Sequence, residues 1–235
     1  MIVEAALAAA GRLLTPQFRA VFFKTLGLTI LVLIGLWFAI GGLAETFAFD
    51  PLAAMLPDMP AWAGWFGLMA AILAGLVLAL GLGLLIAPVT ALIAGFFLDD
   101  VAEIVEREDY PHDAPGRALP LATSALVSAK FLVLVVLGNL LALVLLLVPG
   151  VNIVAFLAVN GYLLGREFFE FAAMRFRSEA DAKALRRRHA GTVFAAGMVI
   201  ALVLSVPLVN LLTPLFAAAM MVHLHKMVSA SERAA

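Results

Sequence analysis

The chain contains no cysteine, which excludes disulfide bonds, thiolate catalysis and cysteine-ligated metals. Charged residues are also scarce, because they make up 13% of the 235 residues, about half of the share in soluble domains. The hydrophobic share is 65%, more apolar surface than a water-soluble fold of this length could bury. The composition therefore predicts an integral membrane protein.

Motifs for enzymes and nucleic-acid binding are missing as well. The chain has no HExxH, GxSxG, P-loop or dinucleotide-binding glycine pattern in a suitable context. His223 and His225 are two residues apart and are interpreted as an interfacial pair at a helix end rather than as metal ligands. We therefore expect no enzyme, no cofactor and no nucleic-acid partner.

Four segments of membrane-relevant length carry no charged residue. Leu26–Ala44 has 19 residues, close to the ~20 that a helix needs to cross a bilayer. Met59–Leu98 has 40, too many for one straight crossing, and Pro88 predicts a kink within it. Phe131–Gly165 and Ala190–Val222 have 35 and 33 residues, which suit neither one full crossing nor two.

Related pentapeptides lie at the centres of these last two runs, VPGVN at 148–152 and VPLVN at 206–210. Proline and glycine reverse the chain, while Asn152 and Asn210 can cap the returning helices. The arms on either side of Pro207 are shorter than the ~17–25 residues of a usual span. We predict helical hairpins, at least one of them re-entrant. The alternative is two external turns between short, tilted helices.

The predicted fold is an all-α integral membrane protein with two long transmembrane helices and two helical hairpins, at least one of which penetrates the membrane only partly. It forms one membrane domain, 1–235. Its predicted parts are an interfacial helix (1–21), a first span (22–44), a second span (62–98), an acidic cytoplasmic segment (99–120), a first hairpin (121–171), a basic cytoplasmic segment (172–189) and a second hairpin (190–226).

The distribution of charge predicts the topology. All 15 Lys and Arg residues can be placed on one side of the membrane, whereas Glu45–Ala61 carries three acidic residues and no basic one. By the positive-inside rule, both termini of this multi-pass protein lie in the cytoplasm and Glu45–Ala61 lies outside. The basic run KALRRRH (183–189) is interpreted as an anchor to anionic lipid headgroups rather than as a ligand site.

Four asparagine residues lie within the apolar runs, where an unpaired side-chain amide is energetically costly. Asn139, Asn152, Asn160 and Asn210 either cap and join helices or offer polar steps for a solute. Their structural use is favoured for the set, while Asn152, Asn160 and Asn210 remain pore or vestibule candidates.

The segment GREFFE (165–170) has two open interpretations. Arg166 and Glu170 lie four residues apart on one helix face and can form an ion pair there. The same two side chains are candidates for a cytoplasmic vestibule.

A candidate anion site opens the first long helix at TPQFR (15–19). Pro16 suits a helix start, and the free backbone amides there favour an anion. Arg19 adds a planar donor fork that matches an oxyanion. The alternative is simple anchoring to lipid phosphate.

The chain resembles the CysZ-like sulfate permeases of bacterial inner membranes over nearly its whole length. The likeness is carried by TPQFRAVFF, IAPVTALIAGFFLDDVAEIVE, VPGVN, DAKALRRRH and, most specifically, VPLVNLLTPLFAAAMM, in this order. The resemblance implies helices with two partly penetrating hairpins, a homo-oligomer in the lipid bilayer, and passage of sulfate or a similar oxyanion into the cytoplasm for cysteine biosynthesis.

The resemblance also implies substrate-binding residues, at Gln17, Phe18 and Arg19. Gln17 stands where the family usually has glycine, and Ala20 stands where it has a second arginine. Only Arg19 therefore matches the charged part of the motif. These departures leave an alternative open, a structural or regulatory membrane protein of the same fold that conducts nothing.

Overall fold

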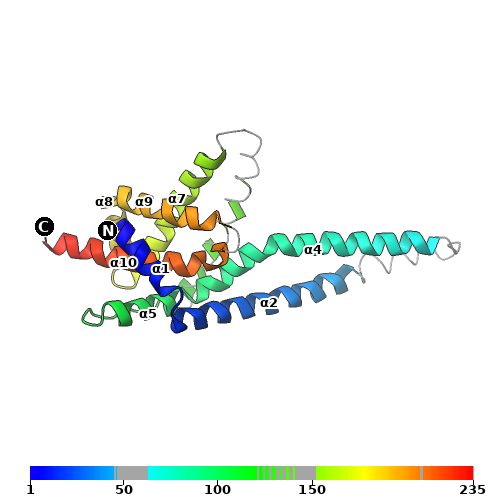
Figure 1. Ribbon diagram of the computed structural model, residues 1–235, viewed down its shortest axis with the longest axis horizontal. Coiled ribbons are helices and arrows are strands. Elements are labelled where there is room, and N and C mark those ends of the chain that lie inside the picture. Colours follow the sequence, from blue (N-terminus) through cyan, green and yellow to red (C-terminus); the bar gives the residue numbers. More distant parts are fainter. Residues whose placement is uncertain are drawn as a thin grey trace.

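The computed structural model describes residues 1–44, 46, 63–120, 152–206 and 209–234, together with residues 122, 123, 125, 126, 129, 130, 133, 136, 137 and 140. Within these residues every regular element is a helix, which confirms the predicted all-α fold. Figure 1 shows two parts, a long helical pair that projects to one side and a bundle that contains both chain termini.

Helices α2 (Pro16–Ala44) and α4 (Ala63–Phe96) form the long pair and pack side by side (Figure 1). With 29 and 34 residues, they are about 44 and 51 Å long at 1.5 Å per residue. Helix α4 remains helical at Pro88, and the helix is interrupted only at Phe97. Both helices therefore exceed the ~30 Å hydrocarbon core of a bilayer.

The long pair turns large apolar side chains away from the protein. Phe38 on α2 is 71% exposed and Trp65 on α4 is 73% exposed. Lipid is the solvent in which such surface is not costly. Further exposed large apolar residues on the two helices are Ile30, Leu31, Ile34, Leu43, Leu68, Met69, Ile72, Leu73, Val77 and Leu80.

The bundle contains the shorter helices. Helix α8 shows why they begin where they do, since the Ser178 side chain accepts a hydrogen bond from the amide of Asp181 and caps the helix. Acidic residues fill its first turn and three arginines fill its last, in line with the helix dipole. The bundle helices are α1 (Ile2–Arg12), α5 (Leu98–Asp109), α7 (Asn152–Met174), α8 (Glu179–Arg188), α9 (Ala190–Leu204) and α10 (Thr213–Ala234).

The second hairpin consists of α9, the short 3-10 helix η2 (Val209–Leu212) and α10. Helix α9 has 15 residues, about 22 Å, and is too short to cross a bilayer. It meets α8 at a bend of 91°, the geometry of a broken span or a re-entrant loop. Pro207 and Leu208, and the first hairpin's tip at 148–151, lie outside the described residues.

By length and hydropathy, two stretches of the described chain are suited to crossing a membrane, Pro16–Leu43 and Val209–Ala234. Their surroundings differ. In the most apolar window of each, 6% of the first is buried but 83% of the second. Helix α10 is the centre of the bundle, packed against α1, α5, α7 and α9.

Candidate functional site

The turn before α2 holds the predicted anion site in a fixed geometry. The hydroxyl of Thr15 donates to the carbonyl of Arg12 (2.7 Å), and the amide of Arg19 donates to the carbonyl of Thr15 (2.9 Å). The amides of Gln17 and Phe18 lie in the first turn of α2, where the helix offers them no acceptor. The helix start therefore presents two amide donors.

Burial of one side chain orients the others at this helix start. Phe18 is 1% exposed, and the buried residues Val21, Thr25 and Thr29 continue the same inward face of α2. Gln17 and Arg19 are exposed, and Arg19 forms no ion pair within the described part of the chain. The guanidinium of Arg19 is thus available beside the free amides.

Arg12, seven residues earlier, differs from Arg19 in its partners. Its guanidinium contacts Glu108 and Asp109 at the end of α5, with 3.1 Å between Nε and the Asp109 Oδ2. The Arg12 side chain therefore fastens α1 to α5 and has little capacity left for a ligand.

The Arg166–Glu170 pair is present, as the spacing predicted. Arg166 Nε lies 3.7 Å from Glu170 Oε1, and Arg186 Nε of α8 lies 2.6 Å from the same oxygen. Glu170 is buried, while Arg166 keeps 41% of its side chain exposed. The spacing indicated the first contact, but nothing in the sequence indicated Arg186.

The asparagines are used in different ways. The buried Asn160 donates to the carbonyl of Phe156 in its own helix (2.9 Å), which agrees with a structural role. Asn210 lies within η2, three residues before α10. Its backbone amide, not its side chain, donates to the carbonyl of Val206 (3.0 Å). Helix α7 begins at Asn152, whose side chain, like all of Asn139, lies outside the described residues.

The structure does not gather these predicted residues into one site. No hydrogen bond or ion pair of the described residues joins Arg19 to Asn160, Arg166, Glu170 or Asn210. Arg19 stands at the start of α2, whereas Arg166 and Glu170 lie on α7. The anion site and the vestibule candidates are separate places.

Sequence reasoning missed the close crossing of α7 and α9. A Cβ atom on Gly197 would lie 1.9 Å from the carbonyl oxygen of Gly161, and one on Gly165 would lie 2.6 Å from that of Val193. Gly161 and Gly165 form a GxxxG pattern, which allows helix backbones to approach in membranes. This pattern was readable in the sequence.

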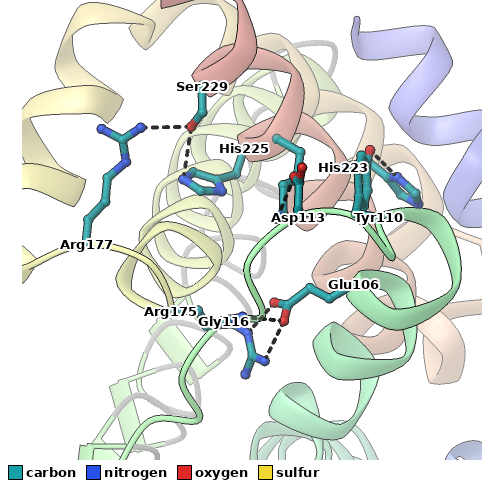
Figure 2. A network of polar contacts seen from close by, with 10 residues as sticks. Glu106, Tyr110, Asp113, Gly116, Arg175, Arg177, His223, His225 and Ser229 are labelled. Atoms are coloured by element: carbon teal, nitrogen blue, oxygen red, sulfur yellow. Dashed lines mark hydrogen bonds and ion pairs between the residues drawn. The ribbon is translucent and has the colours of Figure 1, made fainter. Parts of the chain in front are cut away.

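Sequence reasoning also missed a set of buried polar contacts that join three segments of the chain (Figure 2). We call this set the polar base, and its residues come from segments 99–117, 175–177 and 223–229. Arg175, 2% exposed at its side chain, donates to Glu106 (2.7 Å from Nε to Oε1) and contacts Asp99. The amide of Gly116 donates to Glu106 as well (2.9 Å). Burial alone would lower the pKa of Arg175, but the hydrogen bonds and charges of Glu106 and Asp99 raise it above its ordinary value.

Helix α10 contributes four polar side chains to the polar base, His223, His225, Lys226 and Ser229 (Figure 2). His223 Nδ1 lies 2.9 Å from the hydroxyl of Tyr110, and Lys226 donates to Asp113 (2.9 Å). His225 stacks on Phe176, with ring centroids 5.1 Å apart. Both histidines are buried and lie in the middle of α10 rather than at a helix end. Neither belongs to a metal-binding group of acidic or histidine side chains in the described residues.

Two residues of segment 99–117, Tyr110 and Asp113, have shifted pKa values. Burial, helped by the charges of Asp109 and Asp113, raises the pKa of Tyr110 to about 12, so its hydroxyl stays protonated. The hydrogen bond from Lys226, followed by its charge, lowers the pKa of Asp113. At neutral pH, Tyr110 is therefore neutral and Asp113 is ionised.

The basic run after α7 is largely engaged within the protein. Arg188 lies 3.0 Å and His189 3.1 Å from Glu232 Oε1 near the end of α10. Arg187 is exposed and forms no ion pair with any described residue. The role of this run as a lipid anchor thus rests on Arg187 more than on its neighbours.

Long apolar helices that face away from the protein, joined to a bundle with a buried polar base, define an all-helical integral membrane protein. The chain belongs to the family described as sulfate transporter CysZ/etoposide-induced protein 2.4, whose model matches residues 5–214. The resemblance found in the sequence is therefore confirmed. No curated protein matched the chain in a sequence search. The family is one of transporters, in agreement with a protein that is not an enzyme.

Proposed function

We propose that the chain is a channel or permease for a small oxyanion, with sulfate as its solute. The observation that carries this proposal is the exposed guanidinium of Arg19, which has no ion-pair partner among the described residues and lies beside the free amides of Gln17 and Phe18. The family description, which names a sulfate transporter, supports sulfate as the anion.

The interaction energies fit a conduit. The helix start favours a negative charge by about 0.3–1 kcal/mol, and each charge-assisted hydrogen bond contributes roughly 1.5–3 kcal/mol. One arginine and two amides therefore bind an oxyanion weakly. Weak binding suits transport, since a tightly held ion cannot leave.

The proposed setting is the inner membrane of a bacterium, with both termini in the cytoplasm. The positive-inside rule supports this orientation, since Glu45–Ala61 is the connection without basic residues. The chain has no nucleotide-binding motif, so a gradient or consumption of sulfate in cysteine biosynthesis would drive the flux. We further propose a homo-oligomer embedded in lipid, because the short arm α9 of the second hairpin leaves a chain reversal that neighbouring subunits would cover.

Uptake of labelled sulfate into proteoliposomes tests the proposal, with Arg19→Ala and Arg19→Lys as variants. Arg19→Ala is expected to lower the flux severalfold while the protein still assembles. Arg19→Lys is expected to recover only part of it, since an ammonium group cannot copy the planar fork. Arg187→Ala is the matched control, because Arg187 is also exposed and unpaired in the described structure. Equal flux for wild type and Arg19→Ala would place the site elsewhere.

A second candidate function is a non-conducting membrane protein that organises partners or lipids. The residues that favour it are Gln17 and Ala20, which replace a glycine and an arginine of the family motif. Wild-type uptake no higher than that of empty vesicles, with a working positive control, would favour this second function.

A further inference from the structure

Hydroxyl groups on the apolar helices fall into two groups. Thr25 and Thr29 on α2 each donate to the carbonyl four residues earlier, at 2.9 Å. Thr90 on α4 and Thr213 on α10 have no hydrogen-bond partner among the described residues, although they are only 5% and 1% exposed. A buried hydroxyl without a partner is costly, and such groups in native proteins usually serve a ligand or water.

Both unpartnered hydroxyls lie beside a helix proline. Thr90 follows Pro88 by two residues, and Thr213 directly precedes Pro214. A proline has no amide hydrogen, so the carbonyl four residues before it loses its α-helical donor. At Thr90 the free hydroxyl therefore lies beside an altered backbone ladder inside α4. Pro214 stands in the first turn of α10, where a proline removes no helical hydrogen bond, so at Thr213 the free hydroxyl is the irregular feature. Such interruptions at membrane depth are tolerated where they line protein or water.

The two hydroxyls come from helices that touch. Helix α4 packs on α10, and the buried side chains described on α4, including Thr90, Ile93 and Ala94, lie in its last turns. The burial of α10 begins at Thr213. In Figure 1 the end of α4 lies beside the beginning of α10, where the long pair meets the bundle.

We propose that this junction of α4 and α10 is an aqueous, anion-accepting step of the transport path. The hydroxyls of Thr90 and Thr213 donate hydrogen bonds to the oxygens of a small oxyanion or to the water that accompanies it. The step is separate from the Arg19 site and deepens the proposed function, on which the identity of the anion rests. A hydroxyl suits a passing anion, because it is a donor without a fixed charge that would hold the ion.

The absence of cysteine makes the step directly testable. Thr90→Cys and Thr213→Cys proteins in proteoliposomes are treated with a small thiol reagent that carries a sulfonate. We expect both cysteines to be modified. Thr29→Cys is the matched control, because Thr29 is as buried as Thr90 and Thr213 but its hydroxyl is bonded to its own helix. Its surroundings therefore call for no water or ligand, and we expect this cysteine to stay unmodified. Arg187→Cys is the exposed positive control.

The labelling result tests whether the junction is accessible to water and anions, and it does so independently of the sulfate flux. If Arg187→Cys reacts and either junction cysteine does not, the two-residue step is wrong. It is equally wrong if Thr29→Cys reacts as fast as the junction cysteines. Excess sulfate should slow modification of both. Modification that sulfate does not slow would overturn the oxyanion as the occupant.

Valine variants provide a second measurement that does not depend on cysteine. Thr90→Val and Thr213→Val keep the shape of the side chain and remove the hydroxyl. We expect sulfate flux to fall severalfold with no decrease in the thermal unfolding midpoint, while Thr29→Val keeps its flux. If the wild-type protein conducts sulfate and both valine variants conduct it equally well, the inference about the junction is wrong while the proposed function stands. If wild type conducts none, the proposed function fails, and the labelling still decides whether the step exists.

Discussion

Helices α2 and α10 are both long and apolar enough to cross a membrane, but their surroundings are opposite. Helix α2 turns large side chains such as Leu31 and Phe38 outward, at 65% and 71% exposure. Helix α10 is enclosed by its neighbours from Thr213 to Ser229, with few exposed positions. Two stretches that both qualify as membrane spans, with mean hydropathies of 2.3 and 1.4, therefore face lipid in one case and protein in the other.

Side-chain size and polarity explain the difference. The consecutive alanines Ala217, Ala218 and Ala219 of α10 are fully buried, since small residues let neighbouring helices approach. Further along, the polar side chains of α10 find partners in the polar base, as His223 and Lys226 do. Helix α2 has charged residues only near its start. A helix surrounded by protein can carry polar groups that a lipid-facing helix cannot.

The largest effect is expected from the contacts that hold α5 and α7 around α10. Arg175→Met would leave Glu106 buried without its cation, a change that costs about 3–5 kcal/mol. Arg107→Met is the control, because Arg107 and Glu103 are exposed and 3.7 Å apart, and such a pair contributes less than ~1 kcal/mol. Thermal unfolding in detergent should show a large fall in midpoint for the first variant only. Equal midpoints would mean that the buried cluster does not stabilise the bundle.

The second-largest effect is expected from truncating a leucine on α10, compared with the same truncation on α2. Leu224→Ala on α10 removes a side chain with 0% exposure, and buried leucine truncations cost about 2–5 kcal/mol. Leu31→Ala on α2 removes a side chain that is 65% exposed, so a change within about 0.5 kcal/mol is expected. Unfolding midpoints measured in the same detergent check both values. A comparable loss for Leu31→Ala would indicate that α2 packs against another protein surface, such as a second copy.

The long helices could be predicted from the sequence because they depend on local features, the composition of a run and the spacing of residues within it. Uncharged runs and a bilayer's thickness predict α2 and α4, and the i, i+4 rule predicts the contact of Arg166 with Glu170. The position of Arg19 at a helix start followed from Pro16 beside it. Its binding of an anion stays a prediction.

The polar base could not be predicted, since its partners are far apart in the chain. Arg175 and Glu106 are separated by 69 residues, and Tyr110 and His223 by 113. Periodicity indicates which face of a helix is apolar but not which helix covers it. For that reason His223 and His225 were expected at an interface and not in the interior. The glycine crossing of α7 and α9, in contrast, had a readable local signal.

The smallest expected effect concerns the contact between α10 and the segment after α5. The bond from Lys226 lowers the pKa of Asp113, so the folded state favours the ionised carboxylate. Its contribution to stability is present above the unfolded aspartate pKa of about 3.9 and is lost as the pH falls through the lower folded value. Asp113 is 41% exposed, and solvent screening limits the contribution to about 1 kcal/mol or less. Asp113→Asn should therefore lower the unfolding midpoint slightly at pH 7, and the difference from wild type should shrink as the pH falls below the unfolded aspartate pKa. Glu103→Gln is the exposed control, and a difference for Asp113→Asn that widens on acidification would show that the Lys226 contact does not favour the carboxylate.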